Sequence, residues 1–238
     1  MASASPAPTT AKRRRTPRGL TFEDAGHLYR WNGQQVLSVT QVLHLEGLST
    51  VDQIPGEIRA WALERGRLVH EACALYDVGR LDWSSLDPGL EPYVRAWERF
   101  ATVSDFIAVE VEQRVVGPRK DGPGWMPRWA GTLDARGAMR GYPRILIDRK
   151  CGWGVPPAAR LQLSAYGLTL DEPHVRAVVQ LRPDGVPKLH LYEDNVVLDE
   201  RRWLAALSMV ELKLAWGLLT LEDAAPPLEE GGDECLSD

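Results

Sequence analysis

Two apolar runs that each lead into an aspartate constrain this chain more than any other feature of its sequence. Residues 130–134 read Ala-Gly-Thr-Leu-Asp, and residues 145–150 read Ile-Leu-Ile-Asp-Arg-Lys after a short turn marked by glycine and proline. A carboxylate near the apolar core of a sheet must be paired or must coordinate a metal. The pattern predicts neighbouring strands that bring Asp134, Asp148 and Lys150 to one site. Two aspartates with a lysine beside them indicate metal-assisted hydrolysis of a phosphodiester.

Length and composition favour a single domain. The chain has 238 residues, of which 44% are hydrophobic, so it can bury a sizeable core. It contains no run of about 18 apolar residues, and no apolar segment follows its basic N-terminal stretch, so we expect neither a transmembrane helix nor a secretory signal. Cys73, Cys151 and Cys235 lack the spacing of a metal finger and fit a reducing compartment, which predicts a cytoplasmic protein.

The charge is distributed unevenly, although the formal net charge is only -5. Residues 1–19 contain five basic residues and no acid, whereas residues 222–238 contain seven acids and no base. Both segments are rich in charge, proline or small residues, so we expect a disordered basic tail and a disordered acidic tail. Residues 20–221 are nearly balanced in charge, so charge alone does not indicate a nucleic-acid partner.

Turn and capping residues predict how the chain begins. Residues 20–38 fit a hairpin with Asn32-Gly33 as its turn and with strands over Leu28 to Trp31 and Val36 to Ser38. Ser38 and Gln41 fit a capping box that opens a short helix reaching about Leu45.

The remaining elements follow from apolar spacing and punctuating glycines and prolines. The strand at 145–150 is continuously apolar at its start, so we expect it to be central. The order of helices and strands predicts an α/β fold with a central mixed sheet flanked by helices. We expect helices over 56–76 and 93–100, strands over 106–116, 131–139 and 145–150, a helix from Pro156-Pro157 to about 170, strands over 175–181 and 189–192, and a last helix, capped by Asp199, to about 219.

The Asp-Arg-Lys segment carries the strongest chemical signal. Alternation along a strand places Asp148 and Lys150 on one face. A lysine there can polarise an attacking water or stabilise charge that develops on a phosphate. Carboxylate oxygens suit magnesium or manganese better than zinc. The alternative is a surface Asp–Lys pair at a strand end, and the upstream Gly-Thr-Leu-Asp favours the site.

Two acids on the preceding strand are further candidates. Glu110 and Glu112 alternate onto one face, and either can turn toward the same site. The alternative is that both are simply exposed to solvent.

Two pairs of residues four apart add candidates on helices. Gly66 and His70 share a helix face. A glycine inside a helix costs about 1 kcal/mol relative to alanine, so Gly66 indicates close approach by another backbone or a ligand. His70 is then a candidate metal ligand, the alternative being a structural histidine. Gln162 and Tyr166 repeat this spacing and can contact a nucleic acid, or they can be a helix edge with a half-buried tyrosine.

Together these motifs resemble RecB-like nucleases of the PD-(D/E)xK superfamily, of phage and bacterial type. They occur in the family's order, and the resemblance covers about residues 25–195. The opening, residues 29–43, belongs to it as well. The other motifs are Gly-Arg-Leu-Val-His at 66–70, a strand glutamate, Ala-Gly-Thr-Leu-Asp at 130–134, Asp-Arg-Lys at 148–150 and Gln-Leu-Ser-Ala-Tyr at 162–166.

The resemblance implies a PD-(D/E)xK nuclease core over residues 20–221 and a role for each matching residue. Glu112 fits the motif's glutamate better than Glu110, because an apolar pair follows it. Gln162 and Tyr166 would contact the nucleic-acid backbone or brace the site. The metal would be bound by His70, Asp134, Asp148 and the backbone carbonyl of Arg149, with Lys150 as the catalytic lysine.

Two departures from the family pattern qualify these expectations. The middle residue of the D-x-K motif is usually apolar, whereas here it is Arg149, which faces away from Asp148 and Lys150 and can contact DNA or a neighbouring acid. Some relatives carry an iron–sulfur cluster on four cysteines. This chain has three cysteines, so we expect no cluster.

The expected function is that of a metal-dependent deoxyribonuclease that uses one or two Mg²⁺ or Mn²⁺ ions. By resemblance it would be an exonuclease acting on single-stranded DNA or duplex ends in recombination, repair or phage DNA processing. Its partners would be DNA and a recombination or replication protein, and it would work in a bacterial or phage-infected cell. The alternatives are a structure- or site-specific endonuclease of the same fold and a catalytically silent DNA-binding subunit. Trp129 and Trp153 lie near the motifs and can stack bases, but tryptophans more often pack in the core or at its rim, so neither is counted among the site residues.

Overall fold

The computed structural model describes residues 16–23, 26–49, 56–119 and 124–223. The predicted tails, 1–19 and 222–238, therefore lie outside the described residues except at 16–19 and 222–223. Of these, Gly19 accepts a hydrogen bond from the backbone nitrogen of Asn32 at 2.8 Å, which ties it to the first hairpin.

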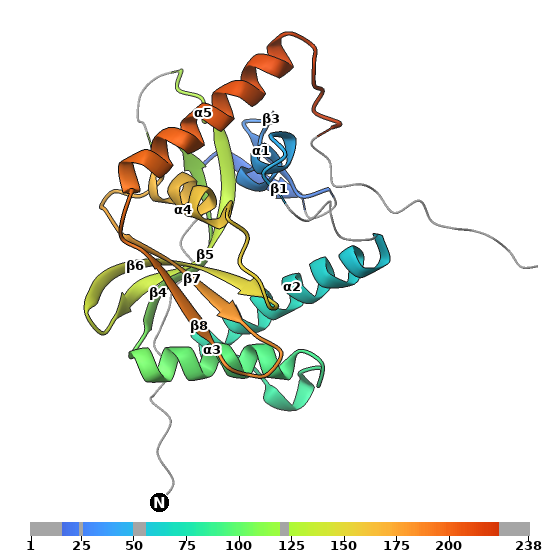
Figure 1. Ribbon diagram of the computed structural model, residues 1–238. Coiled ribbons are helices and arrows are strands. Elements are labelled where there is room, and N and C mark those ends of the chain that lie inside the picture. Colours follow the sequence, from blue (N-terminus) through green and yellow to red (C-terminus); the bar gives the residue numbers. More distant parts are fainter. Residues whose placement is uncertain (1–15, 24–25, 50–55, 120–123, 224–238) are drawn as a thin grey trace, which may run out of the picture.

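A mixed five-stranded sheet forms the centre of the molecule, as the sequence predicts (Figure 1). Neighbouring strands are antiparallel except β6 and β7, which are parallel. The strand with the continuously apolar start is β6, and it is central. In spatial order the strands are β4 (Ile107–Gly117), β5 (Trp129–Met139), β6 (Tyr142–Cys151), β7 (Val175–Leu181) and β8 (Lys188–Tyr192).

Helices cover both faces of this sheet (Figure 1). Alternate side chains of β6 pack against the helices on one face and on the other. Ile145 and Ile147 pack with α2 (Gly56–Asp77) and α3 (Glu91–Ser104). Leu146 packs in the opposite layer. That layer contains α1 (Val39–Leu45), α4 (Ala159–Gly167) and α5 (Val196–Ala215).

The predicted hairpin turn and short helix are confirmed, but the second hairpin strand starts two residues earlier than expected and ends at Val36, and one strand is added. Asn32 and Gly33 have φ values of 49° and 84°, the left-handed conformations that a tight hairpin turn requires. The capping box is present, since Ser38 Oγ accepts from the Gln41 nitrogen at 3.0 Å and Gln41 Oε1 accepts from the Ser38 nitrogen at 2.8 Å. The hairpin gains a further strand, giving a small sheet of β1 (Leu20–Glu23), β2 (Leu28–Trp31) and β3 (Gln34–Val36).

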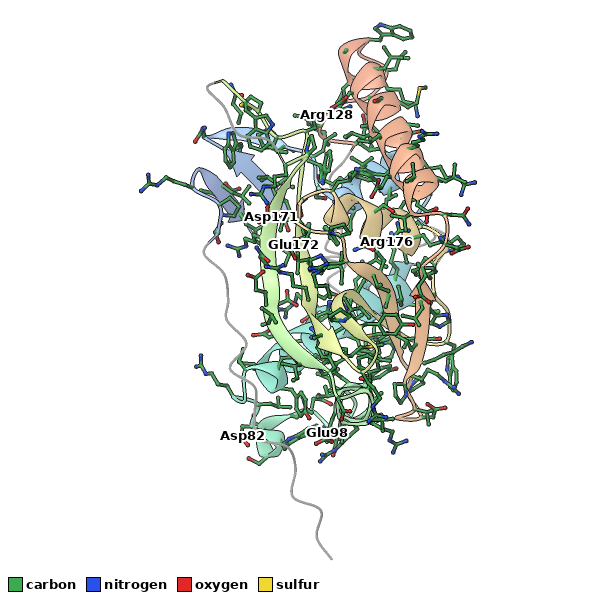
Figure 2. The ribbon with its side chains drawn as sticks, turned by 90° about the vertical axis from the view of Figure 1, so that its left-hand side faces the viewer. Asp82, Glu98, Arg128, Asp171, Glu172 and Arg176 are labelled. Carbon is green, nitrogen blue, oxygen red and sulfur yellow. The ribbon has the colours of Figure 1, made fainter. Side chains whose placement is uncertain are left out.

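Asp199 does not cap the last helix, so that prediction was wrong. The helix α5 begins after Asn195, and Asp199 lies inside its first turn, almost fully buried. Its Oδ2 accepts from Arg160 at 3.0 Å and from Arg176 at 3.1 Å. Arg176 comes from β7 and lies beneath the α4–α5 layer (Figure 2). Burial beside two arginines gives the carboxylate better partners than the helix terminus offers, so it joins α5 to α4 and β7.

Other boundaries shift by a few residues. The helix predicted over 93–100 extends in both directions, a short 3-10 turn (η2, Trp83–Ser85) precedes it, and α5 ends before residue 219. Pro156 and Pro157 lie outside α4, before its N-cap residue Ala158, and not in its first turn. Among the described helices, none has both the length and the apolar character that crossing a bilayer requires.

A change of face in β4 and β5 places polar groups next to the core. Val111 packs in the α2–α3 layer, whereas Val115, four residues later, packs in the opposite layer. On β5, Ala135 likewise packs in the α2–α3 layer and Leu133 in the opposite layer. Simple alternation would keep each pair on one face. Between the valines, Glu112 has a φ of 46°, and this left-handed residue accompanies the reversal.

Candidate active site

Three potential metal ligands from three different elements converge where β4 and β5 change face. They are His70 of α2, Glu112 of β4 and Asp134 of β5, and one ligand atom of each lies within 4.8 Å of the others. Glu112 lies between Val111 and Gln113, whose partners on β5 are Ala135 and Leu133. The register therefore sets Glu112 opposite Asp134, and α2 brings His70 to the same point.

Both ring nitrogens of His70 face this centre. Its Nε2 donates to the backbone carbonyl of Arg149 at 2.9 Å, and its Nδ1 lies 3.4 Å from Asp134 Oδ1. Burial alone would lower the pKa of His70, but the Asp134 carboxylate outweighs it, so the pKa is raised. The imidazole thus joins two groups that can bind a cation, a carboxylate and a carbonyl oxygen.

Asp134 is held as a carboxylate. Its Oδ2 accepts from the backbone nitrogen of Arg149 at 2.6 Å. Burial acts to raise its pKa, but the neighbouring His70 and the cations of Arg149 and Lys150 lower it to about 2. Asp134 therefore carries its negative charge across the physiological pH range.

Asp148 and Lys150 form a second group on β6, beside the first. Ala135 pairs with Ile147, and the same register sets Asp134 opposite Asp148. Lys150 Nζ lies 2.9 Å from Asp148 Oδ2. Burial raises the pKa of Asp148 to about 6 although the lysine opposes this.

The helix after the D-x-K strand holds the lysine from its other side. Lys150 Nζ donates to Gln162 Oε1 at 2.9 Å, and Gln162 Nε2 lies 3.5 Å from the Tyr166 hydroxyl. The Tyr166 ring is buried against Gly131, where an added Cβ would lie 2.7 Å from Tyr166 Cε1. Of the two roles expected for Tyr166, these contacts match bracing of the site.

The convergent ligand group differs from the predicted one in one member. His70, Asp134 and the Arg149 carbonyl meet as expected. Asp148 instead contacts Lys150, and Glu112 completes the three-residue group.

The structure also separates the two glutamates that the sequence placed on one face. Glu110 forms an ion pair with Arg136, with 2.5 Å between Oε2 and Nε. Glu112 lies at the ligand group. The expectation of a shared face was wrong, because the left-handed conformation at Glu112 breaks the alternation.

The sequence left DNA and a neighbouring acid as possible partners of the Arg149 side chain. In the structure its partner is an acid. The guanidinium is fully buried on the α2–α3 side of β6 and forms an ion pair with Asp77. Its Cζ lies 4.1 Å from the centre of the Trp97 ring, and its Nη1 lies 3.9 Å from Glu112 Oε1. Burial on this scale leaves the side chain no surface with which to contact DNA.

Sequence reasoning missed Asp77 and Trp97, which enclose that guanidinium. Asp77 stands seven residues after His70, and this helical spacing places both residues on one face of α2. The spacing was therefore a usable signal for Asp77. Trp97 offered none, because its place depends on how α3 packs.

The structure also places Gly66, Trp129 and Trp153. A Cβ added at Gly66 would meet no atom of another described segment within 4 Å. No other described segment therefore packs against this glycine. The close approach of another backbone is therefore not found among the described residues, and the approach of a ligand stays a prediction. Trp129 is buried in the core as expected, whereas Trp153 is 67% exposed.

No protein-family model matches this chain, and no curated protein matches it.

Proposed function

We propose that this chain is a metal-dependent deoxyribonuclease with a RecB-like PD-(D/E)xK core. The observation that supports this best is the placement of His70, Glu112 and Asp134 beside the Asp148–Lys150 pair at the centre of a mixed sheet. Five residues that the resemblance names thus converge from α2, β4, β5 and β6.

The donor set suits a hard divalent cation. It offers one imidazole nitrogen, two carboxylates and the Arg149 carbonyl, and oxygen-rich sets of this kind favour Mg²⁺ or Mn²⁺. Ligands on opposite sides of a magnesium ion lie about 4 Å apart. A group whose atoms lie within 4.8 Å of one another therefore needs only small side-chain rotations to hold an ion. When bound, one or two such ions would polarise the phosphate and lower the pKa of an attacking water.

Lys150 would supply a fixed positive charge at the phosphate. Burial alone would lower its pKa, but Asp148 and Asp134 raise it above the usual value. At neutral pH the amine is therefore an ammonium, which donates hydrogen bonds and cannot serve as a general base. Asp148 and Gln162 would hold it where charge develops on the phosphate oxygens.

The finer assignment follows the resemblance. We infer an exonuclease that acts on single strands or duplex ends, in the cytoplasm, alongside a recombination or replication protein. The free thiols of Cys73 and Cys151 fit a reducing compartment. A site-specific endonuclease and a silent DNA-binding subunit are the alternatives that an experiment must separate.

The test is cleavage of end-labelled single-stranded, double-stranded and circular DNA with Mg²⁺ or Mn²⁺. We expect wild type to degrade linear DNA and spare circles, and Lys150→Ala to lose cleavage while keeping its fold and its metal affinity. Lys188→Ala, at the exposed start of β8, is the matched control and should keep full activity. Cut circles would identify an endonuclease. Absence of cleavage by wild type on every substrate would favour the silent subunit.

A further inference from the structure

Two exposed tryptophans lie on the segments that carry site residues. Trp61 lies on α2, the helix of His70, and Trp153 follows β6, the strand of Lys150. Their exposed fractions are 62% and 67%, although tryptophan is usually largely buried. Each ring is stacked by an arginine, Arg65 or Arg182. Exposed aromatic surface combined with positive charge indicates a surface that binds a partner.

Trp153 is held at a fixed place beside the site. The Gly152 nitrogen donates to the Leu181 carbonyl at 2.9 Å, and Gln180 Nε2 donates to the Gly152 carbonyl at 2.9 Å. These bonds fasten the turn to the C-terminal end of β7. Since Trp153 follows Lys150 by three residues, their Cα atoms lie within about 10 Å of each other. Such a span corresponds to no more than about three stacked nucleotides.

The cation beside Trp153 is fixed as well. Arg182 comes from the segment after β7, and its Cζ lies 4.6 Å from the centre of the Trp153 ring. Asp184 Oδ2 accepts from the same guanidinium at 2.5 Å. With its ring two-thirds exposed, Trp153 keeps aromatic surface for a further planar group.

Trp61 and Arg65 form a second exposed pair of an aromatic ring and a cation, on α2. Arg65 Cζ lies 4.2 Å from the Trp61 ring centre and 5.1 Å from that of Tyr93. Figure 1 shows β6 ending beside α2, with the N-terminal half of the helix reaching past the sheet.

We propose that Trp61 and Trp153, with Arg65 and Arg182, form a stacking surface for unpaired bases next to the site. The site then takes DNA as a single strand or as a frayed end. This inference rests on the proposed nuclease function and narrows its substrate to DNA with unpaired bases. Base–aromatic stacking tolerates any sequence because every base has a planar face, and the arginines meet the phosphates. In a duplex those faces are covered by the neighbouring pairs, so a stacking surface selects unpaired strands.

The experiment measures binding without cleavage. A labelled twelve-nucleotide oligo(dT) and a blunt hairpin duplex of twelve base pairs are titrated in EDTA by fluorescence anisotropy, with wild type and single variants. We expect Trp153→Ala and Trp61→Ala each to weaken oligo(dT) binding about tenfold and to change duplex binding less than twofold. Trp153→Phe should retain most of the affinity. Trp216→Ala is the matched control, because Trp216 is 69% exposed but follows α5 in the opposite helical layer.

Several outcomes would overturn the inference. Unchanged oligo(dT) binding in both alanine variants would do so, as would an equal loss in Trp216→Ala or an equal loss for the duplex. A wild type that binds neither DNA would also overturn it and would leave the tryptophans as a surface for a protein. Tryptophan-dependent binding by a chain that cleaves nothing with metal would uphold the stacking surface and reject the nuclease, so the two failures are distinguishable.

Discussion

Arg149 and Asp77 form an ion pair that is enclosed directly behind the candidate metal centre, with 0% and 3% of their side chains exposed. Trp97 completes the enclosure, since its Nε1 donates to Asp77 Oδ1 at 2.8 Å and its ring lies under the guanidinium. The backbone of Arg149 meanwhile contacts His70 and Asp134 through its carbonyl and its nitrogen. One residue therefore joins the α2–α3 core to the groups that can bind the metal.

Breaking this pair should be costly. Arg149→Met leaves Asp77 buried without its partner, and we expect the free energy of unfolding to fall by about 3–5 kcal/mol. Adding Asp77→Leu removes the stranded charge and should restore much of the loss. Urea denaturation in EDTA measures both. Arg140→Met, which breaks the exposed pair with Asp105, is the control and should cost under about 1 kcal/mol. A double variant no more stable than Arg149→Met would contradict this account.

The two glutamates of β4 give a direct test of the metal centre. Glu112→Gln removes a charged ligand from the group with His70 and Asp134, so we expect Mn²⁺ affinity to fall at least about tenfold in calorimetry. Glu110→Gln alters an acid two residues away that pairs with Arg136, and it should bind Mn²⁺ like wild type. The Mn²⁺-dependent rise in Tm should follow the same order. Equal losses in both variants would point to a general effect on β4 and not to a ligand.

Much of this fold could be predicted because its signals are local. The turn at Asn32-Gly33, the capping box at Ser38 and the apolar start of β6 each depend on a few neighbouring residues. The D-x-K spacing likewise placed Asp148 and Lys150 together, because alternation along a strand is a local property.

The remaining features depend on contacts between distant segments. Asp77, the partner of Arg149, lies 72 residues away in the sequence. Asp199 binds two arginines from other elements and does not cap its helix. The family resemblance favoured Glu112 over Glu110, but strand alternation placed both on one face, because a left-handed residue inside a strand has no pattern that marks it. Both kinds of miss fall where tertiary contacts override local preference.

The same substitution at two glycines should have opposite effects on stability. Gly131→Ala places a Cβ 2.7 Å from the buried ring of Tyr166, so we expect a loss of about 1–3 kcal/mol. Gly66→Ala meets open space inside α2 and should gain about 0.5–1 kcal/mol from its higher helix propensity. Thermal unfolding compares them.

DNA binding by Gly66→Ala then tests whether a ligand passes over this glycine. We expect weaker binding of DNA despite the higher Tm. A more stable Gly66→Ala variant with unchanged DNA affinity would show that the glycine serves no ligand.

The pKa of Asp148 predicts a conflict between stability and function. Its pKa is raised from 3.8 to about 6 by burial, so protonation favours the folded state. Stability from this group is fully present below pH 3.8 and is lost as the pH rises through about 6. Above that pH the ionised carboxylate costs about 3 kcal/mol, since one pKa unit corresponds to about 1.4 kcal/mol. Asp148→Asn cannot ionise, so it should be more stable than wild type at pH 8 and inactive in cleavage.

The pH dependence of this difference is the measurement. With EDTA present, the stability gain of Asp148→Asn over wild type should grow from its smallest value near pH 4 to its largest near pH 8. Asp82→Asn should change stability in the opposite direction. Asp82 lies at the end of the molecule where α3 lies (Figure 2). Hydrogen bonds from Ser84 lower the pKa of Asp82, so its ionised form stabilises the fold above pH 3.8 and its loss should lower the Tm at pH 8. A gain for Asp148→Asn that does not change with pH would mean that the carboxylate is not strained by burial, and its proposed place at the catalytic centre would lose that support.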